Sequence, residues 1–161
     1  MKNKTIFAAG ADIKNKFIVA KGHDLYLGPD ITDLSSAENY ELFKQEVRKA
    51  TEENKPDIIA CDLHPGYFST KFAKECSLQL ATCSLQPVQH HHAHIASVMH
   101  ECGLEGPVIG FSFDVTGYGT DSNIWGGEFL LVQRDGFERA THLKYWKMPG
   151  GDKAVSEPWR M

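Results

Sequence analysis

The sequence predicts a mixed α/β fold on three observations. Three short apolar runs near the start end in tight turns, a helix-like periodicity follows them, and two further apolar runs then alternate with helical segments. The expected order of elements is therefore β-β-β-α-β-α-β-α. Three antiparallel strands that lead into βαβ units describe a ribonuclease-H-like half domain.

The elements of this half domain follow one another closely. The first strands are expected at 4–9, 15–21 and 24–27, with turn glycines at Gly10 and Gly28. A helix begins after Ser36 and ends near Asn54, because its apolar residues fall three or four apart: Tyr40, Phe43, Val47 and Ala50. A strand at 57–63, a short helix at 67–75, a strand within 80–88 and a helix to about Cys102 complete the order.

A second set of elements restarts this order after residue 104. A strand is expected at 107–113, a turn rich in glycine and threonine at 114–121, and further strands at 124–133 and 137–146. This order, a strand and a turn followed by two strands, repeats the organisation of residues 4–28. We therefore expect domains at 1–104 and 105–161. We also expect the second half domain to be cut short, because the helices that it needs do not follow.

Composition and charge exclude several classes of protein. The 161 residues suffice for one ordinary domain, and 42% apolar with 24% charged residues is typical of a globular protein. A net charge of −4 gives no reason to expect nucleic-acid binding, and no apolar run is long enough to span a bilayer. Cys61, Cys76, Cys83 and Cys102 form no Cys-x-x-Cys pair, so free thiols in a cytoplasmic protein are expected.

Four histidines lie in the run His90-His91-His92-Ala93-His94, directly before an apolar helical segment. Because His90 and His94 are four residues apart, they share one face of a helix and both imidazoles can reach one metal ion. His91 and His92 then point elsewhere, toward bonds that support the ligands or toward a substrate. The alternative is a solvated histidine-rich patch. An affinity tag is disfavoured, because the run is internal.

Asp114 follows the apolar run 108–113. A carboxylate there would complete a set of nitrogen and oxygen ligands with the histidines, although it could instead only cap the turn. The next turn has small residues that let backbone N–H groups approach a phosphate: Thr116, Gly117, Tyr118, Gly119 and Thr120. Lys14 lies in the equivalent turn of the first set of elements, so it is a further candidate for phosphate binding. The turn does not match a lysine-bearing P-loop.

Several motifs in this order resemble the HypF family of carbamoyltransferases. They are GADIKNKFIVAKG, ITDL, IIACDLHPGYFSTKFA, QHHHAHIASVMHE, DVTGYGTDSNIWGGEFL, MPGGD and EPWRM. The resemblance covers essentially the whole chain, and HHHAH and the GYGTD…WGGE pair are its specific motifs. It implies the first part of a Kae-like carbamoyl-transfer domain, which is similar to the actin, Hsp70 and sugar-kinase superfamily.

The resemblance also implies a reaction. Carbamoyl phosphate and ATP give carbamoyl-adenylate, which is bound at a site for a divalent metal (zinc, iron, magnesium or manganese). By motif position the ligands are His90, His94 and Asp114, and the remaining aspartate ligand of the family lies beyond Met161. The carbamoyl group passes to the C-terminal cysteine of the partner HypE and becomes the source of cyanide ligands in nickel–iron hydrogenase maturation. The catalytic residues expected beside that thiol are His91 and His92, while backbone amides of 116–120 hold phosphate oxygens.

Other interpretations stay open at this point. An O-carbamoyltransferase or a threonylcarbamoyl transferase would share the histidine pair, and a non-catalytic fragment would bind only a metal or a partner chain. Full members of the HypF family carry acylphosphatase-like, zinc-finger and YrdC-like regions before this one, and these 161 residues contain none of them. With three ligands and half of a nucleotide pocket, we expect weak or no activity from the chain alone.

Overall fold

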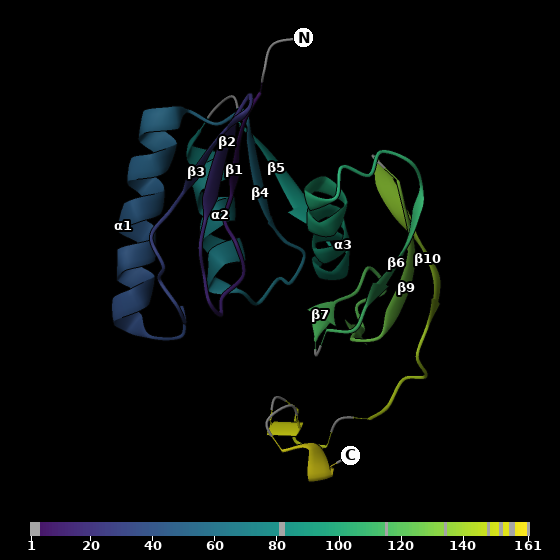
Figure 1. The fold of residues 1–161 in the computed structure, drawn as a ribbon. Coiled ribbons are helices and arrows are strands. Elements are labelled where there is room, and N and C mark those ends of the chain that lie inside the picture. Colours follow the sequence, from purple (N-terminus) through teal and green to yellow (C-terminus); the bar gives the residue numbers. More distant parts are fainter. Residues whose placement is uncertain are drawn as a thin grey trace. The chain divides into compact units, whose positions relative to one another are not determined.

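The computed structural model describes residues 4–80, 83–114, 116–133, 135–147, 149–151, 153–154 and 157–160. The chain forms two compact units, Met1–Val88 and Gln89–Met161. Each unit has a hydrophobic core of its own. Figure 1 shows the elements of both.

The first unit is built on a five-stranded sheet of order β3-β2-β1-β4-β5. Its strands are β1 (Thr5–Ala8), β2 (Ile18–Lys21), β3 (Asp24–Leu27), β4 (Ile58–Asp62) and β5 (Ser84–Val88). β1, β2 and β3 pair antiparallel, whereas β4 pairs parallel with both β1 and β5. The antiparallel meander that passes into βαβ units was predicted from the sequence, and the sheet confirms it.

Two helices, α1 (Ala37–Asn54) and α2 (Phe68–Gln79), supply the apolar side chains that cover this sheet. Phe43 of α1 and Phe72 of α2 share one core with Phe7 and Ile59 of the strands. The helix α2 runs past the expected end at residue 75, because Cys76 continues its buried side. The Asp12 carboxylate accepts the backbone N–H groups of Phe68 and Ser69, at 2.8 and 2.9 Å, and this caps the start of α2.

In the second unit, α3 (His90–Glu101) packs on a three-stranded antiparallel sheet of order β10-β9-β6. The strands are β6 (Val108–Ser112), β9 (Glu128–Gln133) and β10 (Gly136–His142). Ile95 and Met99 of the helix meet Leu130 and Val132 of the sheet in the core. The order β10-β9-β6 repeats the order β3-β2-β1 of the first unit, as the sequence predicted.

The expected strand at 124–133 is interrupted in the structure. It consists of β8 (Ile124–Trp125) and β9, and β8 pairs with β7 (Gly117–Tyr118), which lies inside the expected turn. The break falls at Gly126-Gly127, where the Gly127 carbonyl accepts the Leu143 N–H at 2.8 Å. A Cβ at Gly127 would lie 2.6 Å from the Leu143 side chain, so a glycine here allows another segment of the chain to approach closely.

The sheet of the second unit has an exposed apolar face opposite α3. Phe111 and Phe113 are 61% and 65% exposed and both pack against Phe129. Beyond these elements, the described chain includes the short 3-10 helix η1 (Pro158–Arg160). Among the described helices, none is both long and apolar enough to cross a membrane.

The compact units do not divide the chain where the sequence analysis placed a boundary. The helix α3 belongs to the unit Gln89–Met161, because it packs on β6 and β9. The half domains expected at 1–104 and 105–161 stay a prediction about the repeat. All four cysteines are free thiols, as expected, and Cys61 is a buried core residue.

Candidate metal centre

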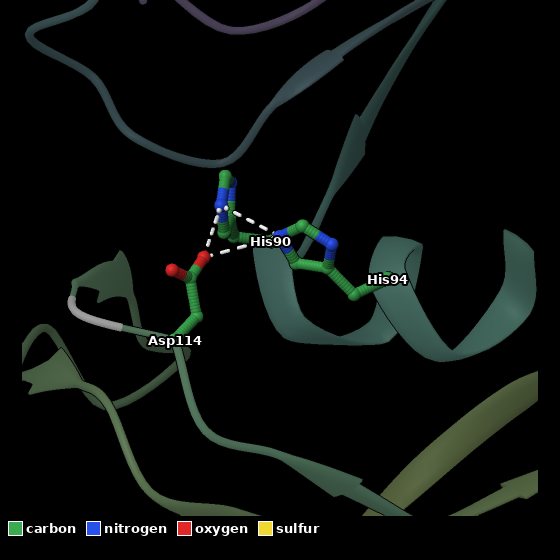
Figure 2. A group of neighbouring side chains, drawn as sticks. All are labelled: His90, His94 and Asp114. Atoms are coloured by element: carbon green, nitrogen blue, oxygen red, sulfur yellow. Dashed lines mark hydrogen bonds and ion pairs between the residues drawn. The ribbon is translucent and has the colours of Figure 1, made fainter. Parts of the chain in front are cut away.

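Two histidine ligand candidates are presented by the first turns of α3. The helix starts directly after Gln89, whose side-chain oxygen accepts the His92 N–H at 2.9 Å and caps the N-terminus. His90 and His94 are one turn apart, so their imidazoles project from the same side of the helix (Figure 2). The spacing argument from the sequence therefore gave the correct relation between these two side chains.

Asp114 comes to the same place from the end of β6. The strand lies close to α3 at Gly110, where a Cβ would sit 2.3 Å from the Ile95 side chain. Asp114 follows four residues later, and its Oδ2 lies 3.0 Å from His90 Nε2 and 3.1 Å from His94 Nε2. The two Nε2 atoms are 3.2 Å apart. The structure thus brings together the three residues that the sequence singled out as metal ligands (Figure 2).

This triangle has the donor set and spacing of a metal site. Ligand atoms about 2.0–2.2 Å from one ion lie roughly 3.0–3.5 Å from each other. Both imidazoles cannot donate to Asp114 and also hydrogen-bond each other, because two N–H groups would then face one another. Lone pairs that converge on one cation remove this conflict. Two imidazole nitrogens and a carboxylate oxygen suit zinc, iron or manganese.

The cluster is open to solvent on one side. The side chains of His90, Asp114 and His94 are 19%, 35% and 56% exposed. An ion can therefore enter without unfolding of the helix. In the described part of the chain, these residues form a group of potential metal ligands whose atoms all lie within 4.8 Å of one another.

The other two histidines of the run face the interior of the unit. His91 is fully buried, and its ring lies 6.2 Å from that of Trp125. His92 packs against Phe137, with ring centroids 4.8 Å apart. Burial lowers the pKa of both imidazoles, and the neighbouring His90 lowers that of His91 further. Both rings are therefore neutral near pH 7, and the catalytic role expected for His91 or His92 stays a prediction.

The glycines of the turn 116–120 pack against side chains of their own unit. A Cβ at Gly117 would lie 2.5 Å from His91 Cε1, and one at Gly119 would lie 2.0 Å from Trp125 Nε1. The Gly119 N–H donates to the Asn123 carbonyl at 2.8 Å, so this amide already has a partner. Thr116 and Tyr118 are half-buried and Thr120 is exposed. Phosphate binding by this turn stays a prediction.

Lys14 lies in the first unit, where it is exposed with a φ of 51°. The neighbouring Asn15 is fully buried, and its side-chain amide donates to the carbonyls of Ala9 and Ala11. These bonds hold the turn 9–15 in shape, which fixes the backbone at Lys14. The structure thus describes an ordered turn at this position, and the phosphate contact expected of Lys14 stays a prediction.

A buried ion pair beside the cluster was not found by the sequence analysis. Arg139 Nε lies 2.6 Å from Glu128 Oε2, and the Glu128 side chain is only 2% exposed. The same guanidinium contacts Asp121 and Tyr145, and it lies over the Trp125 ring at 4.0 Å. Arg139 therefore links the aspartate of the GYGTD segment to the tryptophan and the glutamate of WGGE. No spacing rule indicates it, because Arg139 comes from a different strand.

The fold and the cluster define a mixed α/β chain in which the potential ligand atoms of two histidines and one carboxylate lie within 4.8 Å of one another. Family models assign this class further. Residues 1–101 match the model described as HypF Kae1-like domain, and residues 110–161 match the second subdomain of the carbamoyltransferase Kae1-like domain. The chain belongs to the HypF family of carbamoyltransferases.

Individual relatives agree with this assignment. The chain is 39% identical to carbamoyltransferase HypF2 of Cupriavidus necator and 37% identical to carbamoyltransferase HypF of Rhizobium leguminosarum, over 98% of its own length and 20% of theirs. It matches the crystal structure of full-length HypF in a phosphate- and nucleotide-bound form at 38% identity and a TM-score of 0.85, over 99% of the chain and 21% of that structure. It matches the crystal structure of T. kodakarensis HypF at 41% identity and a TM-score of 0.87, over 98% of the chain and 21% of that structure. The chain thus spans about a fifth of the length of these relatives.

Proposed function

We propose that His90, His94 and Asp114 bind one divalent cation in a carbamoyl-transfer site. The observation that carries the proposal is the triangle of their ligand atoms, which are 3.0–3.2 Å apart. A cation bound there would act as a Lewis acid, which withdraws charge from the phosphate and carbonyl oxygens of a substrate. The protein side chains hold it on one side of α3 and leave the solvent side open.

The substrate proposed for this site is carbamoyl-adenylate, made from carbamoyl phosphate and ATP. Two observations support this choice: the membership of the HypF carbamoyltransferase family, and a matching HypF structure that is described as binding phosphate and nucleotide. The half-buried Thr116 and the exposed Thr120 flank the glycines of the turn that follows Asp114. Their hydroxyl groups are side-chain donors that could reach a phosphate oxygen.

The acceptor proposed is the C-terminal cysteine of a HypE-type partner in the cytoplasm. Its thiolate sulfur attacks the carbamoyl carbon, a C–S bond forms, the C–O bond to the phosphate breaks and AMP leaves. Burial raises the pKa of Cys76 to about 11 and also raises that of Cys61, so these two thiols are poor nucleophiles near pH 7, and the proposed nucleophile is the thiolate of the partner. The thiocarbamate then serves as the precursor of cyanide ligands in nickel–iron hydrogenase maturation.

The first experiment measures binding of Zn²⁺ to the metal-free chain by calorimetry. We expect one tight site, which His94→Ala abolishes. His100→Ala is the matched control, because His100 is exposed on the same helix and lies outside the cluster. Equal Zn²⁺ binding by the wild-type and His94→Ala chains would refute the site.

The second experiment tests the substrate. A non-hydrolysable sulfamoyl analogue of carbamoyl-adenylate is titrated into the chain with and without Zn²⁺. Tighter binding to the metal-loaded chain is expected, and equal affinity would contradict the proposal. Since we expect weak or no transfer by these residues alone, efficient carbamoylation of a cysteine-terminated peptide would show that this expectation is wrong.

A further inference from the structure

The side chain of Gln89 lies within hydrogen-bond distance of three groups at the start of the helix that carries the histidines. Its Oε1 accepts the His92 N–H at 2.9 Å, and its Nε2 lies 3.0 Å from His91 Nδ1 and 3.3 Å from the Tyr118 carbonyl. The residue is 4% exposed. Because Oε1 accepts from a backbone N–H, the other end of the amide is the NH₂ group, which can only donate. The Tyr118 carbonyl is an acceptor, and His91 Nδ1 accepts in the tautomer that is protonated at Nε2, so all three bonds are consistent with one orientation of the amide.

These bonds join the two segments that carry the cluster. Gln89 directly precedes His90, and Tyr118 lies in β7, four residues after Asp114. The amide therefore ties the N-terminus of α3 to the strand that follows the carboxylate.

His91 and Gly117 form a second contact between the start of α3 and β7. Donation from Gln89 to His91 Nδ1 places the imidazole proton on Nε2, which is buried without a hydrogen-bond partner. A buried N–H without an acceptor is destabilising, so packing must hold the ring in place. A Cβ at Gly117 would lie 2.5 Å from His91 Cε1 and 3.0 Å from His90 Cβ. The strand β7 thus lies directly on the first turn of α3.

We propose that Gln89 is a positioning residue that sets the separation between the histidine pair and Asp114. The inference rests on the proposed metal site and adds the residue that holds its two halves in register. Metal ligands must converge within a few tenths of an ångström, and residues that orient them typically change metal affinity by about 10–100-fold. Loss of the link to Tyr118 frees β7, and with it Asp114, while the helix keeps its histidines on one face.

Gln89→Glu separates this role from helix capping. The carboxylate keeps an oxygen to accept the His92 N–H, but it cannot donate to the Tyr118 carbonyl. The probe is Co²⁺, titrated into the metal-free chain and followed by its visible absorption. We expect affinity to fall roughly 10–100-fold with an altered spectrum. Added negative charge alone would attract the cation, so a loss cannot arise from charge. Gln86→Glu, at an exposed position of β5, is the charge-matched control.

Gly117→Ala tests the same connection from the side of β7. Its new methyl group would push the strand away from His91, so it should reproduce the loss of affinity and the spectral change. Thermal unfolding of the metal-free chains separates positioning from a structural role. The inference requires that the Gln89→Glu chain is fully folded at the assay temperature and still binds Co²⁺ poorly.

The outcomes distinguish this inference from the metal site itself. If His94→Ala abolishes Co²⁺ binding while Gln89→Glu and Gly117→Ala bind as wild type does, the positioning role is overturned and the metal site stands. If His94→Ala leaves Co²⁺ binding intact, both fail. A loss of affinity that only follows the unfolded fraction of the Gln89→Glu chain also overturns the positioning role.

Discussion

The ion pair between Arg139 and Glu128 is the contact whose loss should most destabilise the second unit. Glu128 Oε2 lies 2.6 Å from Arg139 Nε, and the Glu128 side chain is 2% exposed. In Arg139→Met the carboxylate stays buried and still accepts the Gly126 N–H at 3.2 Å. Breaking such a pair from one side costs about 3–5 kcal/mol, because an uncompensated charge is left inside. We expect Glu128→Gln to cost less, about 1–3 kcal/mol, because the amide oxygen still accepts from Arg139.

Urea unfolding followed by tryptophan fluorescence measures these costs. Trp125 is 1% exposed and lies under the Arg139 guanidinium, whereas Trp146 and Trp159 are 77% and 78% exposed. The change in tryptophan fluorescence on unfolding therefore arises mainly from Trp125, and it reports on the second unit, which contains all three tryptophans. The double variant Glu128→Leu with Arg139→Met should lose less than the sum of the single losses, because no charge is then buried alone. Two results would refute this reasoning: a loss of unfolding free energy below about 1 kcal/mol for Arg139→Met, or a greater loss for Glu128→Gln than for Arg139→Met.

Three further predictions concern other side chains. Burial alone would raise the pKa of Asp121, but hydrogen bonds from Asn123, Trp125 and Tyr145 lower it, so the stability that this carboxylate contributes should be lost as pH falls below about 4. Asp121→Asn should flatten this acid dependence of the urea midpoint, and an unchanged dependence would contradict the prediction. Burial raises the pKa of Cys76 to about 11, so at pH 8 a disulfide reagent should modify exposed Cys102 first; faster modification of Cys76 would show that the native core opens readily. Phe111 is 61% exposed on an aromatic face, so Phe111→Ser should reduce concentration-dependent association, measured by light scattering, more than Leu78→Ser does. Equal effects of the two substitutions would show that this face does not drive association.

The arrangement of strands could be read from the sequence because local signals and burial agree in both units. Apolar runs bounded by Gly10 and Gly28 predicted the meander, and its repeat in the second unit was visible as the same succession of runs. The internal break at Gly126-Gly127 was not predicted. Periodicity alone does not indicate that the Leu143 backbone and side chain occupy the space beside Gly127.

The cluster of His90, His94 and Asp114 could be predicted because helical spacing is a local property. His90 and His94 lie on one face of any helix that contains both, and Asp114 was placed by the end of a predicted strand. The role of Gln89 could not be predicted in this way. Glutamine is not a favoured N-cap residue, and its second function depends on Tyr118, which approaches it only in the folded unit. The burial of His91 likewise depends on packing against Trp125 and Gly117.

Anomalous diffraction from crystals of the chain grown with Zn²⁺ is the sharpest test of the metal centre. The geometry predicts an anomalous peak bonded to Nε2 of His90, Nε2 of His94 and a carboxylate oxygen of Asp114, since these atoms already converge to 3.0–3.2 Å. Zinc bound only elsewhere, for example by free thiols such as Cys102, with His90 and His94 uncoordinated, would contradict it.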